Sequence, residues 1–365
     1  MRASALAAED DPPGLRIGPL RLWLSQQLPD VDPDKPLAAD LMTGGRSNIT
    51  YLLKQGDQRW VLRRPPLGHV MPSAHDMARE YRVLSGLSRT GFPVPRALAL
   101  CANSDVIDQP FMIMEYVDAR VIMNAADAEL VSEAEAGAIS AALVRILGRL
   151  HEVDVHQAEL ANLGRPDGYL ARQLRRWSQQ WEITRTRELS DINELIKGLT
   201  SQIVGLPEHL PWSLVHGDFR LDNVMFGRND TEVRAVLDWE MSTLGDPVFD
   251  LAIMLVYWSR PGDQLRHQVP VAQGTTDGVG FWSRSQLVSE YQTVTQRDLG
   301  HLDICLGLAC LKLAVIMESI RFRNRAGQQM GAAAGDGELM GQATEALVSM
   351  GLEVAAGGGV GALSH

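Results

Sequence analysis

The chain has 365 residues, and a sequence of this length is expected to form two lobes, each with its own core. Its 45% hydrophobic and 22% charged residues lie close to globular averages, which excludes collagen, coiled coil and extended disorder. The formal net charge of −11 argues against a nucleic acid or an anionic membrane as the main partner.

The cysteines and the apolar stretches exclude further classes. Three cysteines without paired spacing predict neither a disulfide frame nor a zinc site. The apolar stretches at 248–258 and 302–320 are too short for a membrane span or carry charged residues. Acidic residues at 9–11 precede any apolar run long enough for a signal peptide. We therefore expect a reduced, cytoplasmic protein without a membrane partner.

The first third of the chain has the pattern of a small sheet. We expect an N-terminal segment over 1–37, in which residues 1–20 form a loose arm and 20–28 form a short helix. Apolar runs bounded by turn residues then predict strands, and helical spacing predicts one helix over 72–87. The predicted strands are 38–42, 49–54, 59–64, 97–101 and 111–117. Residues 38–117 are therefore expected to form an N-terminal lobe of antiparallel sheet plus one helix.

The rest of the chain is mainly helical in pattern. Long-period apolar spacing predicts helices at 126–152, 170–181, from 248 onward, and at 301–323. Short apolar runs at 212–215 and 233–237 predict strands between them. We expect a larger C-terminal lobe over 118–330 and a partly disordered tail segment over 331–365, glycine-rich from Ala355. The predicted fold class is α+β, with a small sheet lobe before a larger helical lobe.

The segment from His216 to Asn223, His-Gly-Asp-Phe-Arg-Leu-Asp-Asn, carries the strongest chemical signal, and Asp238 follows Asn223 by 15 residues. Phosphoryl transfer needs a carboxylate that orients the acceptor hydroxyl and takes its proton, and Asp218 suits that role. Mg²⁺ prefers oxygen ligands, which Asn223 and Asp238 could supply. In the alternative interpretation His216 is an ordinary loop histidine and the aspartates form turns or cap a helix.

This segment, together with Asp238 and the Gly245-Asp246-Pro247 run before Asp250, resembles the aminoglycoside phosphotransferase family, which shares the protein-kinase fold. The resemblance implies a two-lobed protein-kinase-like fold, ATP as co-substrate and Mg²⁺ as cofactor. It also implies that Asp218 is the catalytic base and that Asn223 and Asp238 bind magnesium. His216 would brace the loop, and Asp250 would have a structural role.

The resemblance extends to nucleotide-binding positions in the first lobe. The glycine turn resembles the family's nucleotide-covering loop through Gly44, Gly45, Ser47 and Asn48, although a plain hairpin turn is the alternative. The family keeps a lysine on the third strand, paired with a glutamate; here Arg63 and Glu80 take these positions. A slip of one residue would select Arg64, and a solvated strand edge is the alternative. Lys and Arg are not interchangeable, so this is a departure from the family. The segment from Glu115 to Val117 resembles the hinge whose backbone pairs with adenine.

The predicted acceptor site is cationic. The helix at 169–187 is rich in arginine and tryptophan, and we single out Arg172, Arg176 and Trp177 as acceptor-site candidates for an anionic substrate. A solvated helix face is the alternative. This helix and residues 62–66 resemble kinase-like domains found alone in bacteria or fused to acyl-CoA dehydrogenases, and the resemblance runs from about 41 to 325. The fused relatives act on hydroxyacyl-CoA thioesters.

Together these patterns predict an ATP-dependent phosphotransferase acting on a hydroxyl of a small-molecule acceptor, a hydroxyacyl-CoA or another anionic metabolite. An aminoglycoside kinase and a non-catalytic nucleotide-binding pseudokinase are the alternatives. A protein kinase is disfavoured because only a few residues separate Asp238 from Gly245, too few for a peptide-docking loop. The sequence leaves open the acceptor, the choice of ATP or GTP, and the oligomeric state.

Overall fold

The computed structural model describes residues 11–42, 48–67, 76–327 and 337–364. The chain divides into two compact units, Met1–Asp118 and Ala119–His365, and each is described by itself. Three of the predicted nucleotide-loop residues, Gly44, Gly45 and Ser47, lie outside the described residues.

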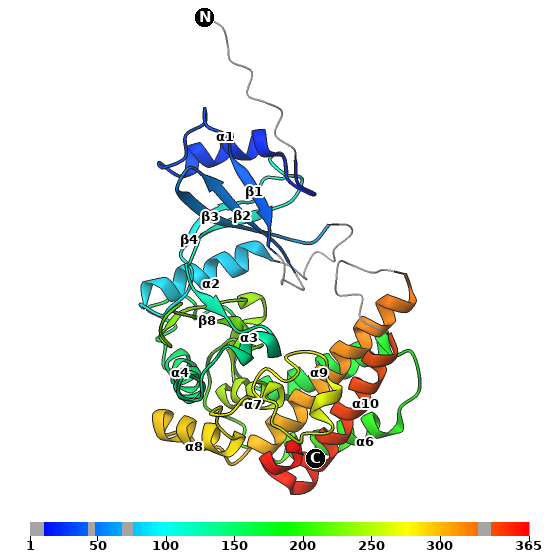
Figure 1. Ribbon diagram of the computed structural model, residues 1–365. Helices are drawn as coiled ribbons and strands as arrows, with labels where there is room; N and C mark the ends of the chain where they lie inside the picture. Colours follow the sequence, from blue (N-terminus) through cyan, green and yellow to red (C-terminus); the bar gives the residue numbers. More distant parts are fainter. Residues whose placement is uncertain (1–10, 43–47, 68–75, 328–336, 365) are drawn as a thin grey trace, which may run out of the picture. The chain divides into compact units, whose positions relative to one another are not determined.

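The first unit contains a five-stranded sheet in which every neighbouring pair is antiparallel (Figure 1). Its order is β1-β2-β3-β5-β4, because the strand that follows β4 along the chain pairs with β3. The strands are β1 (Ala38–Leu41), β2 (Ile49–Gln55), β3 (Gln58–Arg64), β4 (Ala97–Cys101) and β5 (Phe111–Glu115). All five lie at the predicted positions.

Helix α1 (Ile17–Gln27) shares an apolar core with this sheet. Its buried Leu20 and Leu24 cluster with strand residues such as Leu53 and Leu62, and Trp23 lies edge-on to Phe111 at 4.9 Å between ring centroids. The helix predicted at 20–28 is thus present but begins at Ile17, and residues from Leu15 to Leu20, which we expected in a loose arm, are packed in this core. Apolar side chains three and four residues apart give the segment a face to bury.

Helix α2 (Met77–Arg89) is amphipathic and contacts β4 and β5. It begins at Met77, where the Asp76 side chain accepts a hydrogen bond from the backbone N–H of Arg79; residues 72–75 of the predicted helix lie outside the described residues. Its buried residues include Glu80, Val83 and Leu87. A buried glutamate among apolar neighbours requires a partner from the sheet.

The second unit is built around helix α9 (Leu302–Arg325), which packs against several other helices. The partners of α9 are α5 (Tyr169–Thr184), α6 (Ser190–Val204), α7 (Pro247–Tyr257) and α10 (Gly337–Glu353). Because α9 is surrounded, its residues are buried on nearly every side from Leu302 to Val315. The remaining α-helices are α3 (Ala125–Glu129), α4 (Glu133–His151) and α8 (Arg284–Thr295). A capping box of Ser132 and Glu135 starts α4 and divides the predicted helix 126–152 in two.

Short strands interrupt the helices; β7 and β9 lie where the sequence predicted strands, whereas β6, β8 and β10 were not predicted. Strand β7 (Ser213–Val215) pairs with β10 (Thr243–Gly245), and β8 (Val224–Phe226) lies between β6 (Arg120–Val121) and β9 (Val233–Val236). The short 3-10 helices η1 (Leu221–Asn223) and η2 (Trp239–Met241) adjoin these strands.

The C-terminal segment is ordered where the structure describes it, contrary to the partly disordered tail that we expected. Helix α10 runs beside α9 (Figure 1) and buries Met340, Leu347 and Met350. Helical turns continue from 354 to 364, with Ala362 and Leu363 buried. By length and composition the stretch 337–363 could also span a membrane; in the structure α10 packs against α9 and α6 as a core helix of this unit.

Candidate active site

The predicted catalytic loop, residues 216–223, begins after β7 and is fixed by a carboxylate of α7. Asp250 has no exposed surface, and its Oδ2 and Oδ1 accept the backbone N–H groups of His216 (2.6 Å) and Gly217 (2.8 Å). Asp246 places this helix, because its side chain accepts the N–H of Val248 at the N-cap ahead of Pro247. The Gly-Asp-Pro segment thus starts a helix whose first turn holds the loop.

His216 ties the loop to the end of β9. Its Nε2 lies 2.8 Å from the carbonyl oxygen of Leu237, and its Nδ1 lies 3.2 Å from the backbone nitrogen of Asp218. Since the carbonyl can only accept and the N–H can only donate, the ring carries its proton on Nε2. The Trp239 ring packs on the imidazole with centroids 4.7 Å apart. His216 therefore has the bracing position that the resemblance implies.

Only glycine fits the second position of the loop. Gly217 has φ +83°, and a Cβ there would lie 2.7 Å from the carbonyl oxygen of Met241. Both the left-handed backbone and the close approach of the next segment exclude a side chain.

The two predicted metal ligands are brought together by the register of β8 and β9. Val224 is paired with Val236, and the N–H of Leu237 donates to the carbonyl of Asn223 at 2.8 Å. Asn223 thus precedes one strand, and Asp238 follows the other, at the same end of the hairpin. Asp238 has φ +66° and ψ +62°, a left-handed conformation that is uncommon outside glycine and concentrates at functional sites.

The chemistry of this pair fits a hard divalent cation. The Asn223 side-chain nitrogen donates to the backbone carbonyl of Asp218 at 2.9 Å, which fixes the amide and leaves its Oδ1 as the acceptor. The carboxylate of Asp238 supplies a second kind of oxygen. One carboxylate and one amide oxygen suit Mg²⁺, which keeps several waters.

Asp218 is surrounded by polar groups from three elements. Its Oδ1 accepts a hydrogen bond from the hydroxyl of Tyr257 at 3.3 Å and lies 3.7 Å from Nζ of Lys312. Its Oδ2 lies 3.4 Å from Nε of Arg220. Burial by itself would raise the pKa of Asp218, but the charges of Lys312 and Arg220 outweigh it and hold the pKa below its usual value. The carboxylate is therefore charged and oriented at neutral pH.

Sequence reasoning assigned no role to Tyr257, Arg220 or Lys312. Tyr257 ends α7, and Arg220 lies inside the quoted motif, with its guanidinium 5.0 Å from the Tyr257 ring centroid. Lys312 comes from α9, 94 residues after Asp218, so no local pattern links them. The available signal was a lysine between Leu311 and Leu313 in a helix that is apolar on most sides.

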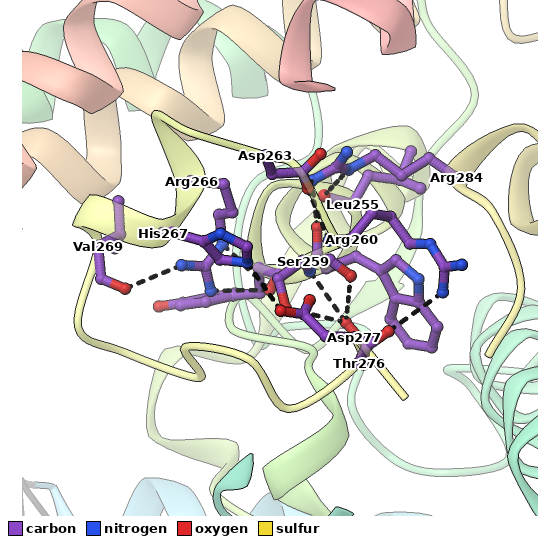
Figure 2. Close-up of polar contacts among 12 residues, drawn as sticks. Leu255, Ser259, Arg260, Asp263, Arg266, His267, Val269, Thr276, Asp277 and Arg284 are labelled. Atoms are coloured by element: carbon purple, nitrogen blue, oxygen red, sulfur yellow. Dashed lines mark hydrogen bonds and ion pairs between the residues drawn. The ribbon is translucent and has the colours of Figure 1, made fainter. Parts of the chain in front are cut away.

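A polar network in the loop after α7 keeps Tyr257 in place (Figure 2). Arg266 donates to the carbonyl of Tyr257 at 2.8 Å, and Arg284 donates to the carbonyl of Leu255 at 3.1 Å and pairs with Asp263 at 2.6 Å. The last carbonyls of a helix have no partner within the helix and favour cations. Two buried arginines therefore satisfy the C-terminal end of α7, where the tyrosine that contacts Asp218 lies.

The first unit holds the predicted phosphate-binding pair. Arg63 Nε lies 3.1 Å from Glu80 Oε2, and both side chains are largely buried. Arg64 points to the other face of the sheet, where it donates to the carbonyls of Gly14 and Pro65. The structure thus brings Arg63, and not Arg64, to Glu80.

The other predicted nucleotide-binding residues in the described part of the chain are Glu115, Val117 and Asn48. The backbone and the side chain of Glu115 are both bonded to Arg96, and Val117 is half-buried just after β5. Asn48 is buried directly before β2.

The predicted acceptor helix is less available than we expected. Arg172 donates to the carbonyls of Asp167 and Arg165 beside its own helix start, and Trp177 is buried. Arg176 is exposed, with its guanidinium 5.2 Å from the centroid of the Trp177 ring. Lys312 lies over the same ring at 5.9 Å. Trp177 therefore supports two cations, and of the three candidates Arg176 is the one exposed to solvent.

The fold and the loop define a phosphotransferase of the kinase-like class. A protein from Ralstonia eutropha, whose crystal structure is assigned as an aminoglycoside phosphotransferase, matches with a TM-score of 0.74 and 30% identity over 93% of this chain and 98% of its own. The aminoglycoside phosphotransferase APH(4)-Ia, in a ternary complex with AMP-PNP and hygromycin B, matches with a TM-score of 0.57 at 14% identity and shares the fold. This match covers 90% of the present chain and 97% of the APH(4)-Ia chain.

The family model of the APH phosphotransferase enzymes matches residues 41–282, and the chain belongs to that family. Curated relatives include mouse acyl-CoA dehydrogenase family member 10, at 32% identity over 84% of this chain, and chicken family member 11, at 34% over 84%. The chain spans 28% and 39% of their respective lengths. The family resemblance and the kinase-like fold expected from the sequence are both confirmed.

Proposed function

We propose that the chain transfers the terminal phosphoryl group of ATP to the hydroxyl of an anionic small-molecule acceptor. The observation that carries this proposal is the geometry of Asp218, a charged carboxylate on a loop braced by His216 and Asp250. Such a carboxylate can accept the hydrogen bond of an acceptor hydroxyl, orient its oxygen and take its proton late in the transfer.

Three kinds of residue have roles in this reaction. Asn223 and Asp238 would hold Mg²⁺, which when bound neutralises charge on the nucleotide phosphates. Arg220, with its guanidinium 3.4 Å from Asp218, places a fixed positive charge where negative charge develops during transfer. Arg63, held by Glu80, is proposed to grip the nucleotide phosphates in place of the family's lysine.

The charge around Asp218 supports an anionic acceptor. Lys312 and Arg220 lie within 3.7 Å of its carboxylate, and Arg176 is exposed over Trp177 nearby on α5. Lys312 and Arg220 are balanced by Asp218 and Asp222, so the exposed Arg176 is the cation that would repel a polycationic aminoglycoside and attract a carboxylate or phosphate. The names of the curated relatives, acyl-CoA dehydrogenase family members, make a hydroxyacyl-CoA the first acceptor to test. The three cysteines are free and buried, which supports the proposed reduced, cytoplasmic location.

The test is a transfer assay with Mg·ATP and a panel of hydroxyacyl-CoA thioesters, free hydroxy acids, kanamycin and peptides, read by ADP release and by mass of the phosphorylated product. We expect phosphorylation of an anionic acceptor, retained Mg·ATP binding in Asp218→Asn, and loss of transfer in that variant. Nucleotide binding without turnover across the panel would favour a pseudokinase. Transfer by Asp218→Asn at the wild-type rate would refute the role of Asp218.

A further inference from the structure

Lys312 is a buried cation in the middle of the helical core. It lies on α9, is 1% exposed, and has the buried residues Leu311 and Leu313 on either side. Removing an ammonium group from water is unfavourable, so a lysine in such a place is destabilising unless it is well paired. Packing does not explain this residue, because an apolar side chain of similar length would suit the surroundings better. The contacts of its ammonium group must provide the explanation.

The ammonium group contacts both the backbone and the side chain of the catalytic loop. Its Nζ donates a hydrogen bond to the carbonyl oxygen of Gly217 and lies 3.7 Å from Oδ1 of Asp218. It also lies 5.9 Å from the centroid of the Trp177 ring on α5. The peptide that joins Gly217 to Asp218 is therefore held through its carbonyl by a charge.

Lys312 completes a set of contacts that fix this part of the loop from separate helices. Asp250 on α7 accepts the N–H groups of His216 and Gly217, so it holds the loop through its donors. Lys312 on α9 holds it through the opposite kind of group, a backbone acceptor. Among the described residues, no other side chain donates a hydrogen bond to the Gly217 carbonyl.

The same charge also orients the carboxylate of Asp218. Tyr257 and Lys312 approach Oδ1, whereas Arg220 approaches Oδ2, so both oxygens have a defined partner. Charged groups at longer range around Lys312 are Asp250, Arg176 and Arg220. Two of these three are cations, which makes Asp218 with Asp250 the negative charge that balances Lys312.

We propose that Lys312 is a positioning residue of the phosphotransfer reaction: its buried ammonium group fixes the Gly217 carbonyl and the Asp218 carboxylate in the orientation that receives the acceptor's hydroxyl. This inference rests on the proposed function, since it assigns Lys312 a role through Asp218. Lys312 touches neither nucleotide nor acceptor in this role. Its loss should therefore lower the rate of transfer without weakening the binding of either substrate.

The experiment compares Lys312→Met, which removes charge and donor, with Lys312→Gln, which keeps a donor, and Lys312→Arg, which keeps the charge. Lys197→Met, which removes the same charge from an exposed position on α6, is the control. A misplacement of about 1 Å can cost about 100-fold in rate, so we expect kcat to fall by that order in Lys312→Met. We expect less loss in Lys312→Arg, and the acceptor KM and the Mg·ATP Kd within about twofold of wild type, which is the scatter of ordinary surface variants.

Several outcomes decide the inference. Wild-type kcat in Lys312→Met, or a rise in KM or Kd that accounts for the whole loss, would overturn it. If circular dichroism shows that Lys312→Met does not fold, the other two variants decide. A higher kcat in Lys312→Arg than in Lys312→Gln supports the inference, and wild-type kcat in both overturns it.

A crystal structure of Lys312→Gln separates this inference from the proposed function. If the wild type transfers no phosphate to any acceptor, the proposed function fails. The Gln variant then still tests the placement: a displaced Asp218 carboxylate supports the positioning contact, and an unmoved one overturns it.

Discussion

Replacement of Asp250 by asparagine should destabilise the predicted catalytic loop, because Asp250 accepts two of its backbone N–H groups. The two carboxylate oxygens accept the N–H groups of His216 at 2.6 Å and Gly217 at 2.8 Å, in a fully buried place. An asparagine has one acceptor oxygen, and its NH₂ group would face the other N–H. One hydrogen bond to a charged group is lost and a buried donor is left unpaired, which together cost about 2–4 kcal/mol. That is a large part of a stability of about 5–15 kcal/mol.

The loss can be measured by urea unfolding followed by circular dichroism, with Glu194→Gln on the exposed part of α6 as a matched carboxylate-to-amide control. Hydrogen exchange at the His216 and Gly217 amides reports the same contact locally, and both should exchange faster in Asp250→Asn. A stability within about 0.5 kcal/mol of wild type, which is the range of an ordinary surface change, together with protected amides would refute the reasoning.

Two further predictions concern other ion pairs. Arg63→Met should raise the Kd for Mg·ATP about tenfold in calorimetry, because about 1.4 kcal/mol of charge-assisted phosphate contact is lost; an unchanged Kd would contradict the assignment of Arg63. Burial lowers the pKa of His301, but its hydrogen bond to Asp246 outweighs burial and raises the pKa above 6.5. The folded state thus binds this proton more tightly than the unfolded state, so the stabilisation is complete below about pH 6.5 and is lost as pH rises through the raised pKa. The stability of wild type relative to His301→Gln should therefore fall as the pH rises above about 6.5, and a flat difference would exclude the linkage.

The sequence by itself determined the strands of the first unit and the chemistry of the catalytic loop. Apolar runs bounded by turn residues are a local property, so all five sheet strands lie where the pattern predicted them. The spacing from His216 to Asn223 determined which side chains follow β7, and the hairpin register then brings Asp238 beside them. Because side chains alternate along β3, Arg63 and Arg64 point to opposite faces of the sheet. Which of these two faces lies against Glu80 is known only from the packing of α2.

Tertiary structure decided the features that depend on segments far apart in the chain. Lys312 and Asp218 meet because α9 packs under the loop, and a helical pattern gives the direction of a side chain without naming its partner. The local pattern also did not predict helix α10, because small apolar and glycine residues are typical of a disordered tail. Only its packing against α9 shows that these residues are buried. Periodicity is set by neighbours along the chain, whereas pairing of charges is set by packing.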